Sequence, residues 1–338
     1  MAQLNMPVLT IAIPTYNRPA QLHNTLSKLL PQLNDECYLS IIDNHSDVPV
    51  EETTAELFCQ YPNVQYKIHR NHVNIGGDSN IIRCFEYCDT PWLWTVGDDD
   101  EILPGAIETI FHDMQAYPNV VSINYSSPSA NRPTRQKASI NYGKEEFLTN
   151  TDSFGALIYI TCNVYQTKYL TAYGHWLANN NTYSCVSQWL VLFYSLNKDG
   201  QTIFSDKIIC TNPVVTTGNE SANITVIQGV STLLDMRITY VEKQLLIDCF
   251  KRDLYNFVSP ESLFRTVTMQ YISTGDKNYL FIFKRLYYTF YKHLGLKIKL
   301  KYLVYYNMLA FMPNLTFRLI RNQYLKIRGI DLNAFIQK

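Results

Sequence analysis

The chain has 338 residues, of which 46% are hydrophobic and 17% charged, and its formal net charge at pH 7 is zero. This composition excludes a disordered chain and is typical of a globular protein with one large domain, or one domain and a smaller appendage. No apolar run reaches the ~18 residues that span a bilayer, and the first residues lack the basic-then-apolar layout of a secretory signal. The eight cysteines show no repeated metal-ligand spacing. We therefore expect a cytoplasmic protein with reduced, mostly buried thiols.

Strands and helices are predicted to alternate along the first 125 residues. Short apolar or β-branched runs typical of buried strands occur at residues 8–14, 37–42, 64–69, 92–96 and 120–125. Helical patterns lie between them: a leucine stripe after Pro19, then residues 51–59, 80–87 and 104–115. This alternation predicts an α/β fold, with a doubly wound, mostly parallel sheet flanked by helices.

The second half of the chain has a more mixed pattern. Residues 128–150 are polar and rich in Pro, Ser and Asn, which predicts a long loop or a lid. Further elements are expected as a strand at 157–166, a helix at 186–196, a strand at 202–210 and a loop at 211–223. The pattern beyond about residue 224 is helical. We therefore expect a sheet domain over residues 1–225 and a helical, basic and aromatic appendage over residues 226–338.

Polar clusters follow four of the predicted strands, at Thr15–Arg18, Asp43–Ser46, Asn74–Asn80 and Asp98–Asp100. In doubly wound sheets, ligands bind beyond the carboxyl ends of the strands, so these clusters predict a binding site. The three consecutive aspartates stand out because adjacent carboxylates repel one another and resist burial. A hard divalent cation such as Mg²⁺ or Mn²⁺ would offset that repulsion. The alternative is an acidic turn with an Asp cap before the next helix.

Four motifs together carry a resemblance to a known family. They are Ile-Pro-Thr-Tyr-Asn-Arg at 13–18, Ile-Asp-Asn-His-Ser at 42–46, Asn-Ile-Gly-Gly at 74–77 and Gly-Asp-Asp-Asp-Glu-Ile-Leu-Pro at 97–104. Over roughly residues 8–225 the chain resembles family 2 glycosyltransferases with the GT-A fold, and among them bacterial O-antigen and capsule enzymes of the abequosyltransferase-like group. The resemblance implies inverting transfer of a sugar from a UDP-sugar or another pyrimidine nucleotide sugar to a growing, lipid-linked surface polysaccharide.

The resemblance also implies a nucleotide-sugar site. Its residues are Pro14, Thr15, Tyr16, Asn17, Arg18, Asp43, Asn44, Asn74, Gly76, Gly77 and Asp98. Thr15 and Tyr16 would line the nucleotide pocket, and Asp43 would accept a hydrogen bond from a ring N–H of the base. Asn74 and the glycines after it would let the backbone approach the donor closely.

The aspartates Asp98, Asp99 and Asp100 are the implied catalytic group. Asp98 would face the ribose, and Asp99 and Asp100 would hold Mg²⁺ or Mn²⁺ against the diphosphate. The chain departs from the commoner Asp-x-Asp-Asp motif, because Gly97 occupies the position of its first aspartate.

A second departure concerns the general base that an inverting enzyme needs. The sequence has no Asp or Glu between Asp152 and Asp199, where the family's base is expected. Asp152, His175 and Glu220 are the nearest alternatives, and the base stays unassigned. A non-catalytic GT-A subunit that binds sugars or assembles with other proteins therefore remains an alternative. A nucleotide-binding oxidoreductase is disfavoured, since Pro-Thr-Tyr-Asn-Arg replaces the glycine-rich phosphate turn after the first strand.

The C-terminal region is strongly basic. Residues 284–328 contain ten Lys or Arg and no Asp or Glu. Cations interleaved with Tyr, Phe and Leu from Lys284 to Lys301 predict a helix that lies on the anionic cytoplasmic face of a membrane, with each Lys or Arg adding ~1 kcal/mol. The alternative is a helical bundle packed on the first domain. No nucleic-acid module accompanies the basic run, so no nucleic acid is expected.

Overall fold

The computed structural model describes residues 6–126, 134–152, 154–180, 186–211, 236–253 and 296–312, with a few single positions beyond residue 232. The chain divides into two compact units, Met1–Thr216 and Thr217–Lys338. The boundary expected near residue 225 and nearly all of the loop expected at 211–223 lie outside the described residues.

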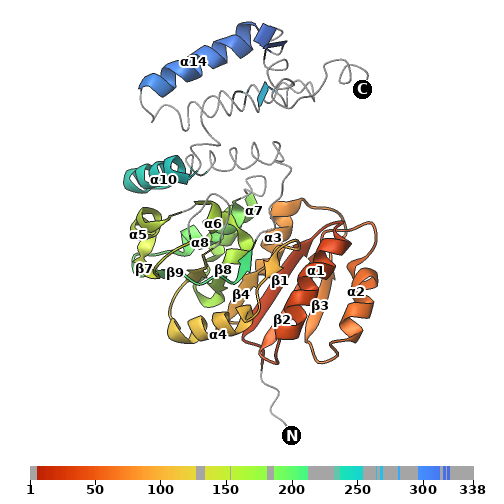
Figure 1. Cartoon of the computed structure of the whole chain (residues 1–338). Coiled ribbons are helices and arrows are strands. Elements are labelled where there is room, and N and C mark those ends of the chain that lie inside the picture. The colour runs from red at the N-terminus through yellow and green to blue at the C-terminus, as the bar shows by residue number, and fades with distance from the viewer. Residues whose placement is uncertain are drawn as a thin grey trace. The chain divides into compact units, whose positions relative to one another are not determined.

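An eight-stranded sheet forms the centre of the first unit (Figure 1). Its strand order is β3 (Tyr66–Arg70), β2 (Cys37–Asp43), β1 (Leu9–Thr15), β4 (Trp92–Thr95), β8 (Asn163–Gln166), β6 (Ser122–Asn124), β9 (Gln201–Phe204) and β7 (Ser139–Tyr142). The first four strands are parallel, β8 runs antiparallel to both its neighbours, and β6 and β9 are again parallel. The predicted α/β fold with a mostly parallel sheet is confirmed.

The register of the parallel strands brings their carboxyl ends to one edge. Thr15 pairs with Asp43 across β1 and β2, and Asp43 pairs with Arg70 across β2 and β3. The backbone continues this alignment beyond β4, where the Val96 amide donates to the Ala12 carbonyl. The polar clusters that follow these strands therefore begin side by side.

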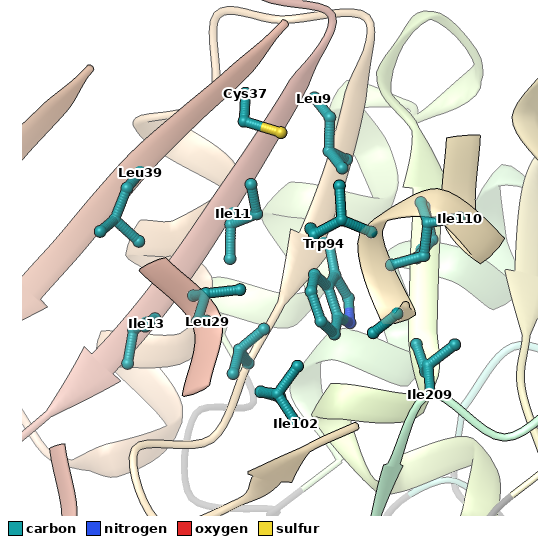
Figure 2. Close-up of a cluster of buried hydrophobic side chains, with 14 of the residues drawn as sticks. Leu9, Ile11, Ile13, Leu29, Cys37, Leu39, Trp94, Ile102, Ile110 and Ile209 are labelled. Carbon is teal, nitrogen blue, oxygen red and sulfur yellow. The ribbon is translucent and has the colours of Figure 1, made fainter. Parts of the chain in front are cut away.

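Helices cover both faces of the sheet. The connecting helices are α1 (Pro19–Leu29, continued by the 3₁₀ turn η1, Leu30–Gln32), α2 (Val50–Cys59), α3 (Gly77–Glu86) and α4 (Ala106–Ala116). On one face, α1, α2 and α4 pack on the sheet around Ile11, Ile13 and Trp94 in a single apolar cluster (Figure 2). α3 contacts β1 and also α8 (Ser187–Ser195), away from that cluster.

The leucine stripe predicted after Pro19 explains how α1 is fixed. Leu22, Leu26 and Leu29 recur at helical spacing and are all buried. Burial of each such side chain contributes about 1.5–3 kcal/mol. α1 is thereby held rigidly next to the loop that follows β4, which matters for the site.

Several predicted boundaries were wrong. Of the loop expected at 128–150, residues Ser139–Tyr142 form β7 and Gly143–Asn150 form α5, whereas residues 127–133 lie outside the described part. β7 is polar because it is an edge strand, paired only with β9. The strand expected at 157–166 begins only at Asn163, after α6 (Phe154–Ile158) and the 3₁₀ turn η2 (Ile160–Cys162).

Three shorter elements complete the described part of this unit. They are the 3₁₀ turn η3 (Thr167–Tyr169), α7 (Ala172–Asn180), and a two-stranded ladder of β5 (Glu101–Ile102) with β10 (Cys210–Thr211). The strand expected at 202–210 is thus two strands, β9 and β10, which belong to different sheets.

The described part of the second unit is helical, with α10 (Tyr240–Asp253) and α14 (Leu296–Phe311). Tyr302 and Leu309 of α14 are buried, and the ring of Tyr305 stacks on Phe264 at 4.4 Å. Among the described helices of the chain, none combines the length and the apolar character needed to cross a bilayer.

Candidate functional site

A pocket of about 370 Å³ lies beyond the carboxyl ends of β1 and β4. Of the residues predicted for the site, it is lined by Pro14, Thr15, Tyr16, Arg18, Asn44, Gly77, Asp98, Asp99 and Asp100. Asn17 faces a second hollow of about 250 Å³ beside Ser46 and Asp47. Asp43, Asn74 and Gly76 line neither pocket, although each contacts residues that shape the first.

Asp98 and Asp99 are joined by one arginine. The Thr15 hydroxyl donates to Asp98 Oδ2 at 2.7 Å, and Arg18 Nη1 donates to Asp98 Oδ1 at 3.1 Å and to Asp99 Oδ2 at 2.9 Å. Burial raises the pKa of Asp98 above its ordinary value, although Thr15 and Arg18 act in the opposite direction. Burial also opposes the charge of Arg18, but the two aspartates outweigh it and raise the arginine's pKa. The pair of carboxylates is thus partly neutralised within the protein.

Asp100 has a different environment. The hydroxyl of Tyr159 donates to its Oδ1 and the hydroxyl of Thr161 to its Oδ2, while the Gly97 amide donates to the Thr161 hydroxyl at 2.8 Å. Burial raises the pKa of Asp100 to about 6, and the two hydroxyl donors hold it down only in part. Asp100 therefore orients Tyr159, which also lines the pocket.

The loop that carries the aspartates is held to α1 by a side-chain hydroxyl. The Thr25 hydroxyl lies 3.0 Å from the carbonyl oxygen of Asp98 and 3.0 Å from that of Asp100, and it is fully buried. Position 97 favours glycine, because a Cβ there would overlap the carboxylate of Asp100. The glycine in place of the usual first aspartate is thus part of this packing.

The donor set at Asp99 fits a divalent cation that completes its shell with phosphate and water. Mg²⁺ is usually held by one or two carboxylates together with substrate phosphates. Asp99 is 44% exposed and only its Oδ2 accepts from Arg18. Within the described residues no group of three His, Cys, Asp or Glu forms a closed metal site. The metal role of Asp100 stays a prediction. Both oxygens of Asp100 already accept hydrogen bonds from Tyr159 and Thr161, so Asp99 is the better ligand.

At the end of β2, Asp43 forms an ion pair with Arg70. Asp43 is fully buried, its Oδ1 accepts from the Ser46 amide at 2.8 Å, and its Oδ2 accepts from Arg70 Nη1. Arg70 Nη2 also donates to the Ser46 carbonyl at 2.7 Å. The role of Asp43 toward the base stays a prediction, and Arg70 is an additional donor beside it.

A chain of asparagine amides links β2 to α3. Asn44 Nδ2 donates to Asn74 Oδ1 at 2.8 Å, Asn71 Nδ2 donates to Asn44 Oδ1 at 3.0 Å and to Asn80 Oδ1 at 2.8 Å. Asn74 Oδ1 also accepts from the Gly76 amide at 2.9 Å, where the positive φ of 87° favours glycine. These bonds fix the loop that leads into α3.

The three candidates for the base are not placed alike. Asp152 is bound by Arg135, with Nε to Oδ2 at 2.9 Å, and does not line the pocket. His175 packs edge-on against Phe85, and burial lowers its pKa. Glu220 lies outside the described residues. No base is therefore assigned.

Sequence reasoning missed Thr25, Arg70, Tyr159 and Thr161. Three of them act through contacts with residues more than 55 positions away, for which the sequence carries no local signal. Arg70 ends the third parallel strand, so its position at the binding edge could have indicated a role.

Comparisons with known proteins bear on the family and the fold of the chain. The sequence profile described as glycosyl transferase family 2 matches residues 10–174, just under half of the chain. A curated relative, the uncharacterized protein MT1568 of Mycobacterium tuberculosis (strain CDC 1551 / Oshkosh), is 26% identical over 104 residues. That match spans 31% of this chain and 31% of the relative's length.

Two solved structures share the fold. S. aureus TarS 1-349 in complex with UDP-GlcNAc superposes with a TM-score of 0.59 at 12% identity, over 96% of this chain and 93% of that one. The mannosyltransferase PcManGT from Pyrobaculum calidifontis, in complex with GDP-Man and Mn²⁺, gives a TM-score of 0.50 at 11% identity, over 91% and 88%. At such identities they bear on the fold alone. The profile match therefore relates residues 10–174 to glycosyl transferase family 2, and the sheet domain has the GT-A fold of these solved structures.

Proposed function

We propose that the protein transfers a sugar from a pyrimidine nucleoside-diphosphate sugar to a hydroxyl of a saccharide acceptor, with inversion at the anomeric carbon. The observation that carries the proposal is the convergence of Thr15, Arg18, Asp98 and Asp99 on one pocket of about 370 Å³. Solved structures of the same fold contain UDP-GlcNAc in one case and GDP-Man with Mn²⁺ in another, which supports a nucleotide-sugar donor.

The groups around the pocket suit the departure of a charged leaving group. In the transfer, the acceptor oxygen forms a bond to the anomeric carbon while the bond from that carbon to the diphosphate breaks, and the acceptor proton passes to a base. Arg18, which lines the pocket, would present positive charge to the diphosphate. A divalent cation held by Asp99 would further neutralise the leaving group as a Lewis acid.

The pyrimidine assignment rests on the resemblance, in which Asp43 would accept a hydrogen bond from a ring N–H of uracil or thymine. Both carboxylate oxygens of Asp43 already accept from Ser46 and Arg70, so the base would have to share Oδ1 or displace Arg70. A thermal-shift panel of UDP, dTDP, CDP and GDP sugars with Mn²⁺ tests this directly. We expect the largest stabilisation from UDP or dTDP sugars, and stabilisation by GDP sugars alone would exclude the assignment.

We further propose that the acceptor belongs to a bacterial surface polysaccharide, such as O-antigen or capsule, built on a lipid at the cytoplasmic face of the membrane. This rests on the resemblance of the sequence motifs to enzymes of the abequosyltransferase-like group. It also rests on α14, which exposes Leu296, Leu300, Val304 and Phe311. The lysines Lys297, Lys299 and Lys301 flank that apolar face, as expected for contact with an anionic lipid surface.

A non-catalytic sugar-binding subunit is the second candidate, favoured by the unassigned base. Donor hydrolysis with Mn²⁺ separates the two, measured on the wild type, on Asp99→Ala, and on Asp35→Ala as a control. Asp35 is exposed and precedes β2, at the opposite edge of the sheet. We expect metal-dependent release of UDP from the wild type and the control, and its loss in Asp99→Ala. Absence of turnover with every nucleotide sugar, despite binding, would favour the non-catalytic alternative.

A further inference from the structure

α7 presents two stacked aromatic rings to the solvent. The rings of Tyr173 and Trp176 are stacked with centroids 6.0 Å apart and an interplanar angle of 17°. Their side chains are 49% and 58% exposed. We call this pair the aromatic platform. Single exposed aromatics are ordinary, but two large exposed rings held nearly parallel to one another form a prepared apolar surface.

The platform is supported rigidly from the opposite side of the helix. Gly174 and Ala178 are buried, and a Cβ at Gly174 would lie 2.9 Å from the Val191 carbonyl oxygen of α8. The two helices therefore pack backbone against backbone at this point. Tyr194 of α8 also meets the Tyr173 ring edge-on, at 5.5 Å and 87°. Little conformational freedom remains to be lost when a ligand binds.

α7 carries no charged residue of its own, since from residue 169 to residue 197 the sequence contains no Lys, Arg, Asp or Glu. Two charged side chains come close from other elements and both are engaged: Glu86 accepts from Arg83 and Asn179, and Lys144 lies over the Phe193 and Tyr194 rings. A neutral, hydroxylated ligand suits this surface. Asn179 and Asn180 are exposed beside the rings, and Asn180 Nδ2 donates to the Trp176 carbonyl at 2.7 Å. The side-chain oxygen of Asn180 is thereby oriented away from its own helix turn. Flat ring faces with neighbouring amides match a pyranose, which has an apolar C–H face and hydroxyls around its rim.

α7 lies beside the helix that borders the donor pocket (Figure 1). His175 contacts Phe85 of α3 at 5.9 Å, and Gly77 and Asn80 at the other end of α3 line the pocket. At 1.5 Å per residue, Phe85 is about 12 Å along the helix from Gly77. A sugar on the platform would therefore be separated from the reacting hydroxyl by a few sugar units, and not be the reacting unit itself.

We propose that the aromatic platform is a binding site for a neutral pyranose within the acceptor chain, upstream of the hydroxyl that receives the new sugar. This inference rests on the proposed transfer to a saccharide. It adds a site outside the donor pocket and predicts that longer acceptors bind better than monosaccharides.

The test uses the full chain and neutral oligosaccharides of four to six units from the cello-, malto- and chito- series, with binding followed by saturation-transfer difference NMR. We expect at least one series to bind, and Trp176→Ala to weaken that binding about tenfold or more, which corresponds to ~1.4 kcal/mol. Trp176→Phe keeps a ring and should retain most of the affinity. Tyr142→Ala removes a ring of 50% exposure on β7 and should change nothing.

Donor hydrolysis and the melting temperature are measured on the same variants. The inference holds if Trp176→Ala loses oligosaccharide binding with hydrolysis and folding unchanged, and it holds even if the wild type proves inactive toward every donor. It is overturned if no series binds an active wild type, if Trp176→Ala binds as well as the wild type, or if Tyr142→Ala weakens binding equally. Loss of anionic-vesicle binding in Trp176→Ala, with oligosaccharide binding intact, would also overturn it.

Discussion

The hydroxyl of Thr25 reaches the backbone of Asp98, with its oxygen 3.0 Å from the carbonyl oxygen. It is equally close to the carbonyl of Asp100, so one buried side chain on α1 fastens the loop that holds all three aspartates. The buried leucines hold α1 on the sheet, and Thr25 on the same helix therefore holds the loop in place.

Thr25→Val should loosen this loop without removing any group from the pocket. We expect a loss of about 1 kcal/mol in the free energy of unfolding, because a buried hydrogen bond is removed. We also expect a several-fold loss in Mn²⁺-dependent donor hydrolysis. Thr54→Val is the matched control, since Thr54 is equally buried and its hydroxyl bonds only within α2. Equal losses of activity in both variants would contradict the role of Thr25.

Arg18→Gln should raise the affinity of the protein for Mn²⁺ measured without donor. Arg18 competes with a cation for Asp98 and Asp99, and a pair such as Arg18–Asp99, in which both side chains are exposed, is worth up to about 1 kcal/mol. We therefore expect up to about fivefold tighter Mn²⁺ binding, measured as the loss of the free-ion signal in electron paramagnetic resonance. Arg83→Gln removes an arginine of similar exposure, paired with Glu86, and should have no effect. Unchanged or weaker binding in Arg18→Gln would exclude the competition.

Asp100→Asn should change how stability depends on pH. The pKa of Asp100 is about 6 in the folded protein and about 3.9 in an unfolded chain, so the native state binds more protons between these values. The free energy of unfolding therefore falls as pH rises from about 4 to 6, by roughly 3 kcal/mol for this group. Asparagine removes that dependence.

The measurement is urea unfolding at pH 4.5, 5.5 and 7.5, with a chelator present. The stability of the wild type relative to Asp100→Asn should be highest at pH 4.5 and lowest at pH 7.5. The shift of Asp98 has the same direction but is present in both proteins, so it cancels in the comparison. Parallel pH profiles for the two proteins would show that Asp100 does not titrate in this range.

Replacing the three lysines of α14 by glutamine should weaken binding to vesicles that contain anionic lipid. Each Lys near an anionic surface contributes about 1 kcal/mol, so the combined change corresponds to roughly a hundredfold loss of partitioning. Sedimentation with vesicles of phosphatidylglycerol and phosphatidylcholine measures it. The control replaces three exposed lysines of the first unit: Lys67, Lys137 and Lys198. If both triple variants bind equally, α14 is not the contact surface.

The donor side of the site was predictable because its signals are local. Each polar cluster follows a strand directly, and parallel strands bring such clusters to one edge whatever the helices between them do. The alternation of strands and helices therefore predicts that the clusters at Thr15–Arg18 and Asp98–Asp100 share one edge, where the Thr15 hydroxyl does donate to Asp98. The predicted element boundaries were wrong where a strand pairs with a distant part of the chain. The sequence of β7 is polar, and it is a strand because it pairs with β9, about 60 residues later.

The partners of Asp100 could not be predicted in the same way. Tyr159 and Thr161 approach from η2, which precedes the antiparallel strand β8, and neither belongs to a motif. The resemblance gave Asp98 a role toward the ribose and Asp99 and Asp100 a role toward the metal, but it gave no partners for them, whereas the structure gives Asp98, Asp99 and Asp100 three different environments. The three environments differ in burial and in long-range hydrogen bonds, and both depend on the tertiary structure.

Gly97 limits how this motif can change during evolution. Restoring the commoner aspartate at that position would force its Cβ into the carboxylate of Asp100, whose Cγ would lie only 3.0 Å away. To make room, Asp100 would have to turn away from the hydroxyls of Tyr159 and Thr161. A change at position 97 would therefore be felt by a region about 60 residues downstream, which links the two regions energetically.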